Sequence, residues 1–204
     1  MKRLLVLLVL GLAALSAMAD APAILVFGDS ISAGYGLEHI DGGWVGMLRA
    51  KLKAEGYGYQ VINASVSGET TAGGVARLPR ALELHHPQIV IIELGGNDGL
   101  RALPVDQMRG NLAKMIDLSV GSGARVLLLG MRIPPNYGPE YTERFHAAFG
   151  DVAQAKKAAL VPFLLADIAL SADLMQPDGV HPNEHGQPKL LANVWPALKP
   201  FLQK

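Results

Sequence analysis

The chain of 204 residues contains no cysteine, which excludes disulfide bonds, a thiol nucleophile and metal sites built from thiolates. It also lacks an excess of charge, because 18 lysines and arginines balance 18 aspartates and glutamates. A neutral chain has no electrostatic footprint for nucleic acid, so we expect no nucleic-acid partner. Aromatic residues are scarce as well, at 6% of the chain, which leaves few stacking platforms for a sugar ligand.

The longest apolar run lies near the start of the chain and has the pattern of a cleaved export signal. Lys2 and Arg3 are followed by the apolar residues 4–15 and by the small-x-small sequence Ala17-Met18-Ala19. The run is shorter than the ~18–20 residues of a spanning helix, and the alternative is a retained membrane anchor. We predict that residues 1–19 are removed, that the protein is exported to the bacterial periplasm or the medium, and that no stable membrane anchor remains.

Short apolar segments alternate with longer amphipathic segments along the rest of the chain. The predicted strands are residues 23–27, 59–62, 89–94, 125–129 and 160–163, and the predicted helices are 43–55, 73–84, 104–120, 140–157 and 187–198. This rhythm favours βαβ units and a parallel sheet with helices on both faces. Residues 20–204 show no repeat and no linker, so we predict a single α/β domain.

Polar, glycine-rich segments follow three of the predicted strands. They are residues 28–32, 65–68 and 95–98. In parallel sheets covered by helices, ligands bind outside the carboxyl ends of the strands. The three segments are therefore expected to meet at one edge of the sheet and to form a site there.

Three residues in and beyond these segments have the chemistry of a serine hydrolase. Ser30 follows the first strand, and Asp178-Gly179-Val180-His181 lies in a tight loop near the end of the chain. A serine becomes a strong nucleophile when a histidine takes its proton and a carboxylate orients the histidine. The alternatives are a helix cap at Asp29 or Ser30 and a surface turn around Asp178. A metal pair of His181 and His185 lacks a third ligand, so we expect no metal.

Two further residues suit an oxyanion hole. The Asn97 side chain can donate a hydrogen bond to a tetrahedral intermediate, and the alternative is a cap of the next turn. Gly68 has no Cβ, which lets its N–H approach a substrate closely or serves the turn alone.

These residues resemble the four sequence blocks of the SGNH (GDSL-type) hydrolases. The blocks are Gly28-Asp29-Ser30, Gly68, Gly95-Gly96-Asn97-Asp98 and Asp178-x-x-His181, in the family's order. Residues 62–74, 93–101 and 134–138 are similar to the bacterial thioesterase I / lysophospholipase L1 / arylesterase branch. The resemblance spans the chain beyond the predicted export signal.

The resemblance implies both a fold and a set of roles. The fold is a three-layer, flavodoxin-like sheet of five parallel strands. Ser30 is expected as nucleophile, His181 as base and Asp178 as the residue that orients it. The Ser30 and Gly68 N–H groups and the Asn97 side chain are expected to form the oxyanion hole, and no cofactor is implied.

The predicted activity is hydrolysis of carboxylic esters and thioesters through an acyl-serine intermediate, in a protein expected to be a monomer. The substrate is a small acyl ester or thioester, and apolar residues near the site are candidates for an acyl groove: Leu78, Leu100, Leu103, Ile133, Pro134, Tyr137 and Met175. Ordinary packing is the alternative for these residues. Alternative functions are a carbohydrate O-deacetylase with the same triad and a non-catalytic binding module, and nothing in the sequence indicates the extended cleft of a protease.

Overall fold

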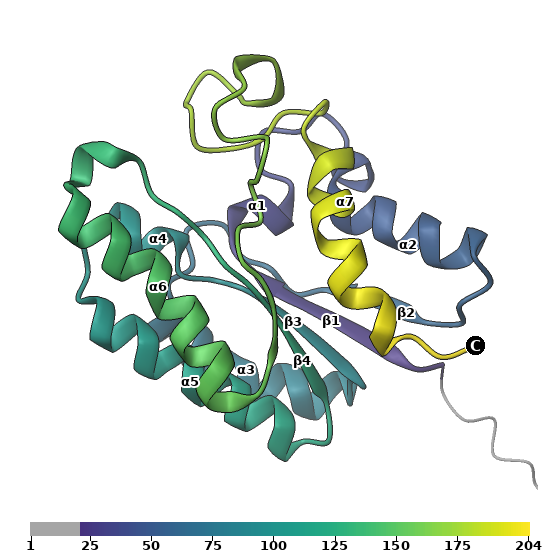
Figure 1. The fold of residues 1–204 in the computed structure, drawn as a ribbon. Helices are drawn as coiled ribbons and strands as arrows, with labels where there is room; N and C mark the ends of the chain where they lie inside the picture. The colour runs from purple at the N-terminus through teal and green to yellow at the C-terminus, as the bar shows by residue number, and fades with distance from the viewer. Residues whose placement is uncertain (1–20) are drawn as a thin grey trace, which may run out of the picture.

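Five parallel strands form one sheet in the order β2-β1-β3-β4-β5 in the computed structural model, which describes residues 21–204 (Figure 1). The strands are β1 (Ala23–Gly28), β2 (Gln60–Asn63), β3 (Ile89–Glu93), β4 (Arg125–Leu129) and β5 (Ala159–Val161). Every residue of β1 and β3 is buried, as continuous apolar runs in a parallel sheet require.

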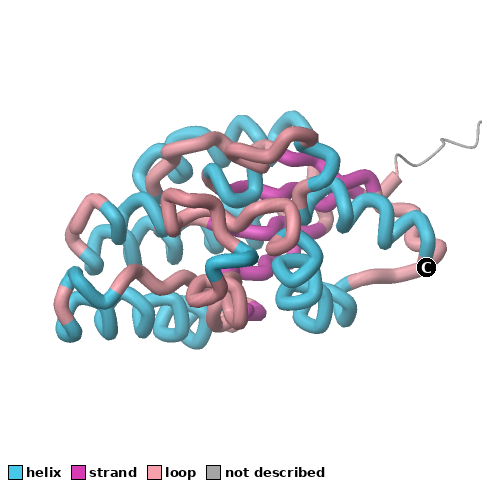
Figure 2. Tube along the Cα trace, turned by 90° about the horizontal axis from the view of Figure 1, so that it is seen from above, coloured by secondary structure: helices cyan, strands magenta, loops and turns pink. Residues whose placement is uncertain are grey.

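Helices cover both faces of this sheet, so the prediction of a three-layer fold is confirmed (Figures 1 and 2). One layer contains α2 (Trp44–Ala54) and α7 (Gln187–Leu198), and the other contains α3 (Thr71–His85), α5 (Val105–Gly121) and α6 (Pro139–Lys156). The short helices are α1 (Ser30–Ala33), α4 (Gly96–Leu100) and the 3₁₀ turns Ile40–Gly42, Pro135–Tyr137, Ala172–Leu174 and Lys199–Phe201.

The expected elements are present, with shifts of a few residues at their ends. Helix α3 begins two residues earlier than expected, because the Thr70 side chain accepts a hydrogen bond from the Gly73 N–H and caps it. The helix also continues through Pro79. The short helix α1 begins where a cap at Asp29 or Ser30 was the alternative, and Asp29 is its cap. The short helix α4 was not expected, because five residues carry no detectable periodicity.

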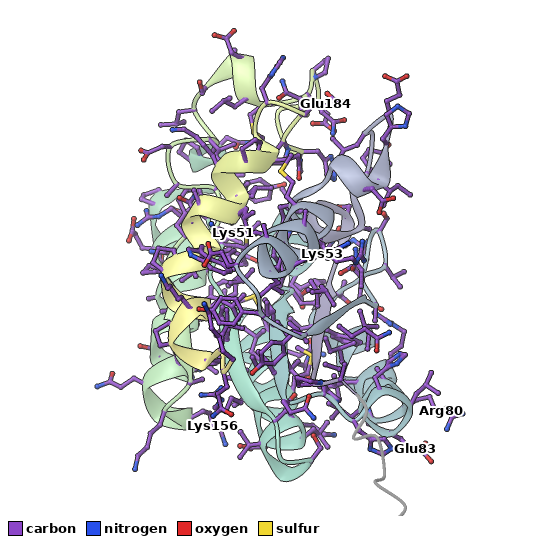
Figure 3. All side chains as sticks on the ribbon, turned by 90° about the vertical axis from the view of Figure 1, so that its right-hand side faces the viewer. Lys51, Lys53, Arg80, Glu83, Lys156 and Glu184 are labelled. Carbon is purple, nitrogen blue, oxygen red and sulfur yellow. The ribbon has the colours of Figure 1, made fainter. Side chains whose placement is uncertain are left out.

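Aromatic and aliphatic side chains fill the space between the sheet and each helix layer. Trp44 of α2 is fully buried on one face, and Phe145 and Phe149 of α6 are fully buried on the other. Their rings meet edge to face, with centroids 5.4 Å apart. The charged side chains of Arg80 and Glu83 point outward from the molecule (Figure 3).

The sheet topology creates a crevice position between β1 and β3. These two strands are neighbours with Gly28 beside Glu93, yet the chain leaves β1 toward β2 and leaves β3 toward β4. Ligands bind at such a reversal of strand order, outside the carboxyl ends of the strands. The predicted export signal lies outside the described residues, and within residues 21–204 no helix is long and apolar enough to cross a membrane.

Candidate active site

Ser30 lies at the carboxyl end of β1, as the first residue of α1. The cap of this helix is Asp29, whose side chain accepts a hydrogen bond from the Ile31 N–H at 3.1 Å. Ser30 therefore does not serve as the cap, and its hydroxyl is free to bond elsewhere. Its Oγ lies 2.8 Å from Nε2 of His181, across 151 residues of sequence.

The loop before α7 orients His181. Nδ1 of His181 lies 2.7 Å from Oδ2 of Asp178, and Oδ1 of Asp178 accepts hydrogen bonds from the N–H groups of Val180 and His181. The His181 carbonyl in turn accepts a hydrogen bond from the Gln176 N–H at 2.7 Å. Ser30, His181 and Asp178 thus form one continuous chain of hydrogen bonds.

The Asp178 carboxylate keeps its charge in this loop. Burial by itself would raise its pKa, but hydrogen bonds from the His181 N–H, the His181 ring and the Val180 N–H outweigh burial and lower the pKa to about 2. The carboxylate is therefore ionised at neutral pH and can stabilise an imidazolium beside it.

Asn97 and Gly68 border the same cavity as Ser30. Asn97 lies in α4, directly after β3, and its Nδ2 donates to Oδ2 of Asp29 at 3.1 Å. Gly68 has a φ of +79°, which side chains disfavour, and its carbonyl accepts a hydrogen bond from Nη2 of Arg101 at 3.0 Å. The structure brings both residues to the carboxyl edge of the sheet beside Ser30.

A second, buried carboxyl group lies beneath the serine turn. Oε2 of Glu93 accepts hydrogen bonds from the Asp29 N–H at 3.2 Å and from Ser32 Oγ at 2.7 Å, and Oε1 has no hydrogen-bond partner among the described residues. Burial and the nearby Asp29 raise the pKa of Glu93 well above its usual value. A Cβ at Gly28 would lie 2.5 Å from Glu93 Oε2, so the glycine makes room for this carboxyl group.

A largely apolar cavity of about 520 Å³ opens beside Ser30 and His181. Four of the residues proposed for the acyl groove line it: Leu100, Ile133, Pro134 and Met175. The expectation is corrected at the other three. Leu78 is fully buried in the core between α3 and the sheet, and Tyr137 and Leu103 are not among the residues that line the cavity. The Tyr137 hydroxyl donates to the Leu100 carbonyl.

Sequence reasoning missed several residues that line the cavity: Tyr35, Met131, Phe163, Leu165, Ala169 and Leu170. Met131 and Phe163 could have been predicted, because they follow the carboxyl ends of β4 and β5. No sequence signal indicates Leu170, which lies in an irregular loop. Within the described part of the chain, no group of three histidine, aspartate or glutamate side chains is arranged to hold a metal ion.

Comparisons with known proteins agree with the fold. The sequence profile of the GDSL-like lipase/acylhydrolase family matches residues 26–188. Esterase TesA of Pseudomonas aeruginosa is 52% identical over 193 residues, which cover 95% of this chain and 96% of TesA. Thioesterase 1/protease 1/lysophospholipase L1 of Escherichia coli K12 is 37% identical over 184 residues, which cover 90% of this chain and 86% of that protein.

A solved structure is also similar. The psychrotrophic esterase EstA of a Pseudoalteromonas species, in a form inhibited by monoethylphosphonate, has a TM-score of 0.83 and 42% sequence identity. The likeness covers 88% of this chain and 97% of EstA. These similarities extend over nearly the whole length of both chains, so they concern the complete domain and not a shared motif.

Proposed function

Since the chain belongs to the GDSL-like lipase/acylhydrolase family, as its four sequence blocks predicted, we propose that it is a serine esterase that hydrolyses carboxylic esters and thioesters. The observation that carries the proposal is the hydrogen-bonded chain from Ser30 Oγ through the His181 ring to Asp178, with steps of 2.8 and 2.7 Å. A histidine within hydrogen-bond reach of both groups is the arrangement that nucleophilic catalysis by serine requires.

The reaction proceeds in two acyl transfers. Ser30 Oγ attacks the carbonyl carbon while its proton passes to Nε2 of His181, and Asp178 stabilises the resulting imidazolium. The tetrahedral intermediate collapses, the bond to the leaving oxygen or sulfur breaks, and His181 returns the proton to the leaving group. Water then attacks the acyl-serine with His181 as base, which releases the carboxylic acid and restores Ser30.

The negative charge that forms on the carbonyl oxygen needs hydrogen-bond donors. We assign this role to the N–H groups of Ser30 and Gly68 and to the Asn97 amide, which all border the cavity beside Ser30. The Arg101 contact to the Gly68 carbonyl and the Asp29 contact to Asn97 hold two of these donors in place.

The apolar lining of the cavity favours an acyl chain over a sugar. Its lining includes the aliphatic and sulfur-containing side chains of Ile133, Leu165 and Met175. A carbohydrate O-deacetylase would need polar groups to bind sugar hydroxyls, and the cavity is largely apolar, so acyl esters and thioesters are the favoured substrates. Export to the periplasm or medium stays part of the proposal and is supported by the leader-like residues 1–19. A monomeric state is proposed as well.

Labelling with a fluorophosphonate tests the assignment directly. We expect stoichiometric labelling of the wild type with loss of esterase activity, and no labelling of a Ser30→Ala variant that melts at the wild-type temperature. A panel of p-nitrophenyl esters with acyl chains of two to twelve carbons then measures which chain lengths the cavity accepts. Unchanged hydrolysis by Ser30→Ala, or labelling at another serine, would exclude the proposed nucleophile.

A further inference from the structure

Tyr35 packs against the ring of His181 at the mouth of the cavity. The two ring centroids lie 4.6 Å apart and the ring planes are tilted by 41°. The tyrosine is nevertheless 54% exposed and lines the cavity. One part of the ring therefore contacts the histidine, and the rest faces the space that a bound substrate would occupy.

The backbone on both sides of Tyr35 is held in one conformation. Gly34 and Gly36 have φ angles of +77° and +74°, and the Tyr35 N–H donates to the Ser30 carbonyl at 3.0 Å. The Tyr35 carbonyl accepts a hydrogen bond from Nε2 of Gln176 at 2.8 Å. A Cβ at Gly36 would collide with the Gln176 side chain, so this contact depends on glycine. The ring is thus presented from a fixed turn between the serine loop and the histidine loop.

The position beside His181 decides which part of a substrate meets this ring. His181 must return its proton to the leaving oxygen or sulfur, so the leaving group passes within hydrogen-bond distance of Nε2. The aliphatic residues that suit an acyl chain, such as Ile133 and Leu165, line the same cavity, whereas the aromatic ring that packs on His181 is that of Tyr35. We therefore expect the leaving group of an ester to lie near His181 and Tyr35, and the acyl chain to lie near residues such as Ile133 and Leu165.

We propose that Tyr35 is the leaving-group contact of this enzyme and that its exposed ring favours esters whose alcohol or phenol half is planar and aromatic. The proposal rests on the proposed function, because it takes Ser30 as nucleophile and His181 as the acid that protonates the leaving group. Pairs of aromatic rings gain affinity beyond the area that they bury, which corresponds to about a 3- to 10-fold preference in kcat/KM.

Two esters of butanoic acid separate this contact from general effects. Benzyl butanoate and cyclohexylmethyl butanoate share the acyl group and have leaving groups of similar size and basicity, but only benzyl alcohol is planar and aromatic. In Tyr35→Leu we expect the ratio of kcat/KM for the benzyl ester to kcat/KM for the cyclohexylmethyl ester to fall by about 3- to 10-fold. Tyr35→Phe keeps the ring and is expected to keep the wild-type ratio.

Other outcomes overturn the proposal. An equal loss on both esters would mean that Tyr35 only supports His181, and a change in acyl-length preference between benzyl acetate and benzyl octanoate would place the ring on the acyl side. Tyr35→Trp provides a check that does not depend on the leucine variant folding: its ratio should equal or exceed that of the wild type, and a lower ratio contradicts the proposal. Hydrolysis that persists in Ser30→Ala would instead overturn the proposed function, so the two failures are distinguishable.

Discussion

Two aspartates serve the same serine, one from the loop that carries His181 and one from the turn that carries Ser30 itself. The Asp178 side chain is 40% exposed and bonds to the histidine ring, whereas Asp29 is buried and bonds to the Asn97 amide. Their surroundings shift the two pKa values in opposite directions, to about 2 for Asp178 and to about 6 for Asp29.

Different balances of burial and hydrogen bonding explain these shifts. At Asp29, burial is the largest effect and raises the pKa, and hydrogen bonds from the Ile31 N–H and the Asn97 side chain offset only part of it. At Asp178, hydrogen bonds from the histidine and from two N–H groups outweigh a smaller burial. The carboxyl group of Glu93 adds a second buried acid beside Asp29.

The contrast follows from what each carboxyl group does. In the proposed mechanism Asp178 faces an imidazole that becomes charged during the reaction, so its own negative charge is needed. Asp29 and Glu93 accept hydrogen bonds from the Asn97 amide, the Asp29 N–H and the Ser32 hydroxyl, and the geometry of these bonds is what fixes the serine turn. In this proposal Asp178 acts through its negative charge, whereas Asp29 and Glu93 act through the hydrogen bonds that they accept.

The largest expected effect comes from removing the charge of Asp178. In Asp178→Asn the amide keeps the size of the side chain but no longer stabilises the imidazolium or selects the reactive tautomer of His181. We expect kcat/KM on p-nitrophenyl butanoate to fall by about 10³–10⁴, as in other serine hydrolases with a triad. Because the site is partly exposed, the melting temperature should change little.

The size of this loss also tests whether Asp178 works alone. Tyr35 contacts the same histidine, and the Gln176 N–H bonds to the histidine carbonyl, so other contacts also hold the ring. A loss below tenfold would show that these contacts suffice to orient the base. The negative charge of Asp178 would then not be needed, and the proposed contrast with Asp29 and Glu93 would be wrong. Asp173→Asn, on an exposed turn outside the cavity, is the matched control.

Much of the fold was predictable because its cause is local in the sequence. Apolar runs such as residues 89–94 and amphipathic segments such as 104–120 give the strand and helix pattern, and parallel pairing then follows from their alternation. The end of β5 was less predictable, since the strand stops at Val161 and the chain turns at Pro162. Short helices such as α4 depend on contacts between distant segments.

The site was predictable where a residue type carries its own chemistry. Ser30, Asp178 and His181 combine a nucleophile, a carboxylate and a base, and glycine-rich strand ends indicate where they meet. Tyr35 and Glu93 were missed because their roles depend on distance alone: a ring 4.6 Å from the histidine and a carboxyl group under the serine turn. Leu78 was assigned wrongly, because helical spacing does not show whether an apolar residue faces the core or a ligand cavity.

An intermediate effect is expected at Asn97, the proposed oxyanion-hole donor that bonds to the buried Asp29. Asn97→Ala removes a donor to the oxyanion and should lower kcat by about 10²–10³. Asp29→Asn places an amide donor opposite the Asn97 amide donor, since its single oxygen also bonds to the Ile31 N–H, and we expect a loss of about tenfold.

A double variant shows whether the two residues act as one unit. If Asp29 acts by orienting Asn97, Asp29→Asn adds less than a twofold loss when Asn97 is already alanine. Independent, multiplicative losses in the double variant would mean that Asp29 supports the serine turn and not the oxyanion donor. The measurement is kcat on p-nitrophenyl butanoate at pH 8, where Asp29 is ionised.

The smallest expected effect concerns the pH dependence of stability. Because the pKa of Glu93 is raised, the folded protein holds this proton more tightly than the unfolded chain does. As the pH rises above 4.5, the ordinary pKa of a glutamate, Glu93 therefore lowers the free energy of unfolding. Asp178 has the opposite sign: its stabilisation is present above pH 3.8 and is lost as pH falls toward about 2.

The variant Glu93→Gln isolates the contribution of Glu93 to the pH dependence of stability from that of Asp178. Glutamine keeps the shape and hydrogen bonds of a protonated glutamate but does not titrate. Urea unfolding at pH 5, 6.5 and 8 should give stability within about 1 kcal/mol of the wild type at pH 5 and a shallower decline toward pH 8. Glu93→Ala leaves the Asp29 N–H and the Ser32 hydroxyl without a buried acceptor and should be destabilised by about 2–4 kcal/mol at pH 5. The difference from the wild type should narrow toward pH 8, because alanine does not titrate. If the stability of Glu93→Gln falls between pH 5 and pH 8 as much as that of the wild type, the titrating proton is not on Glu93. Glu93 would then be charged in the folded protein, as Asp178 is.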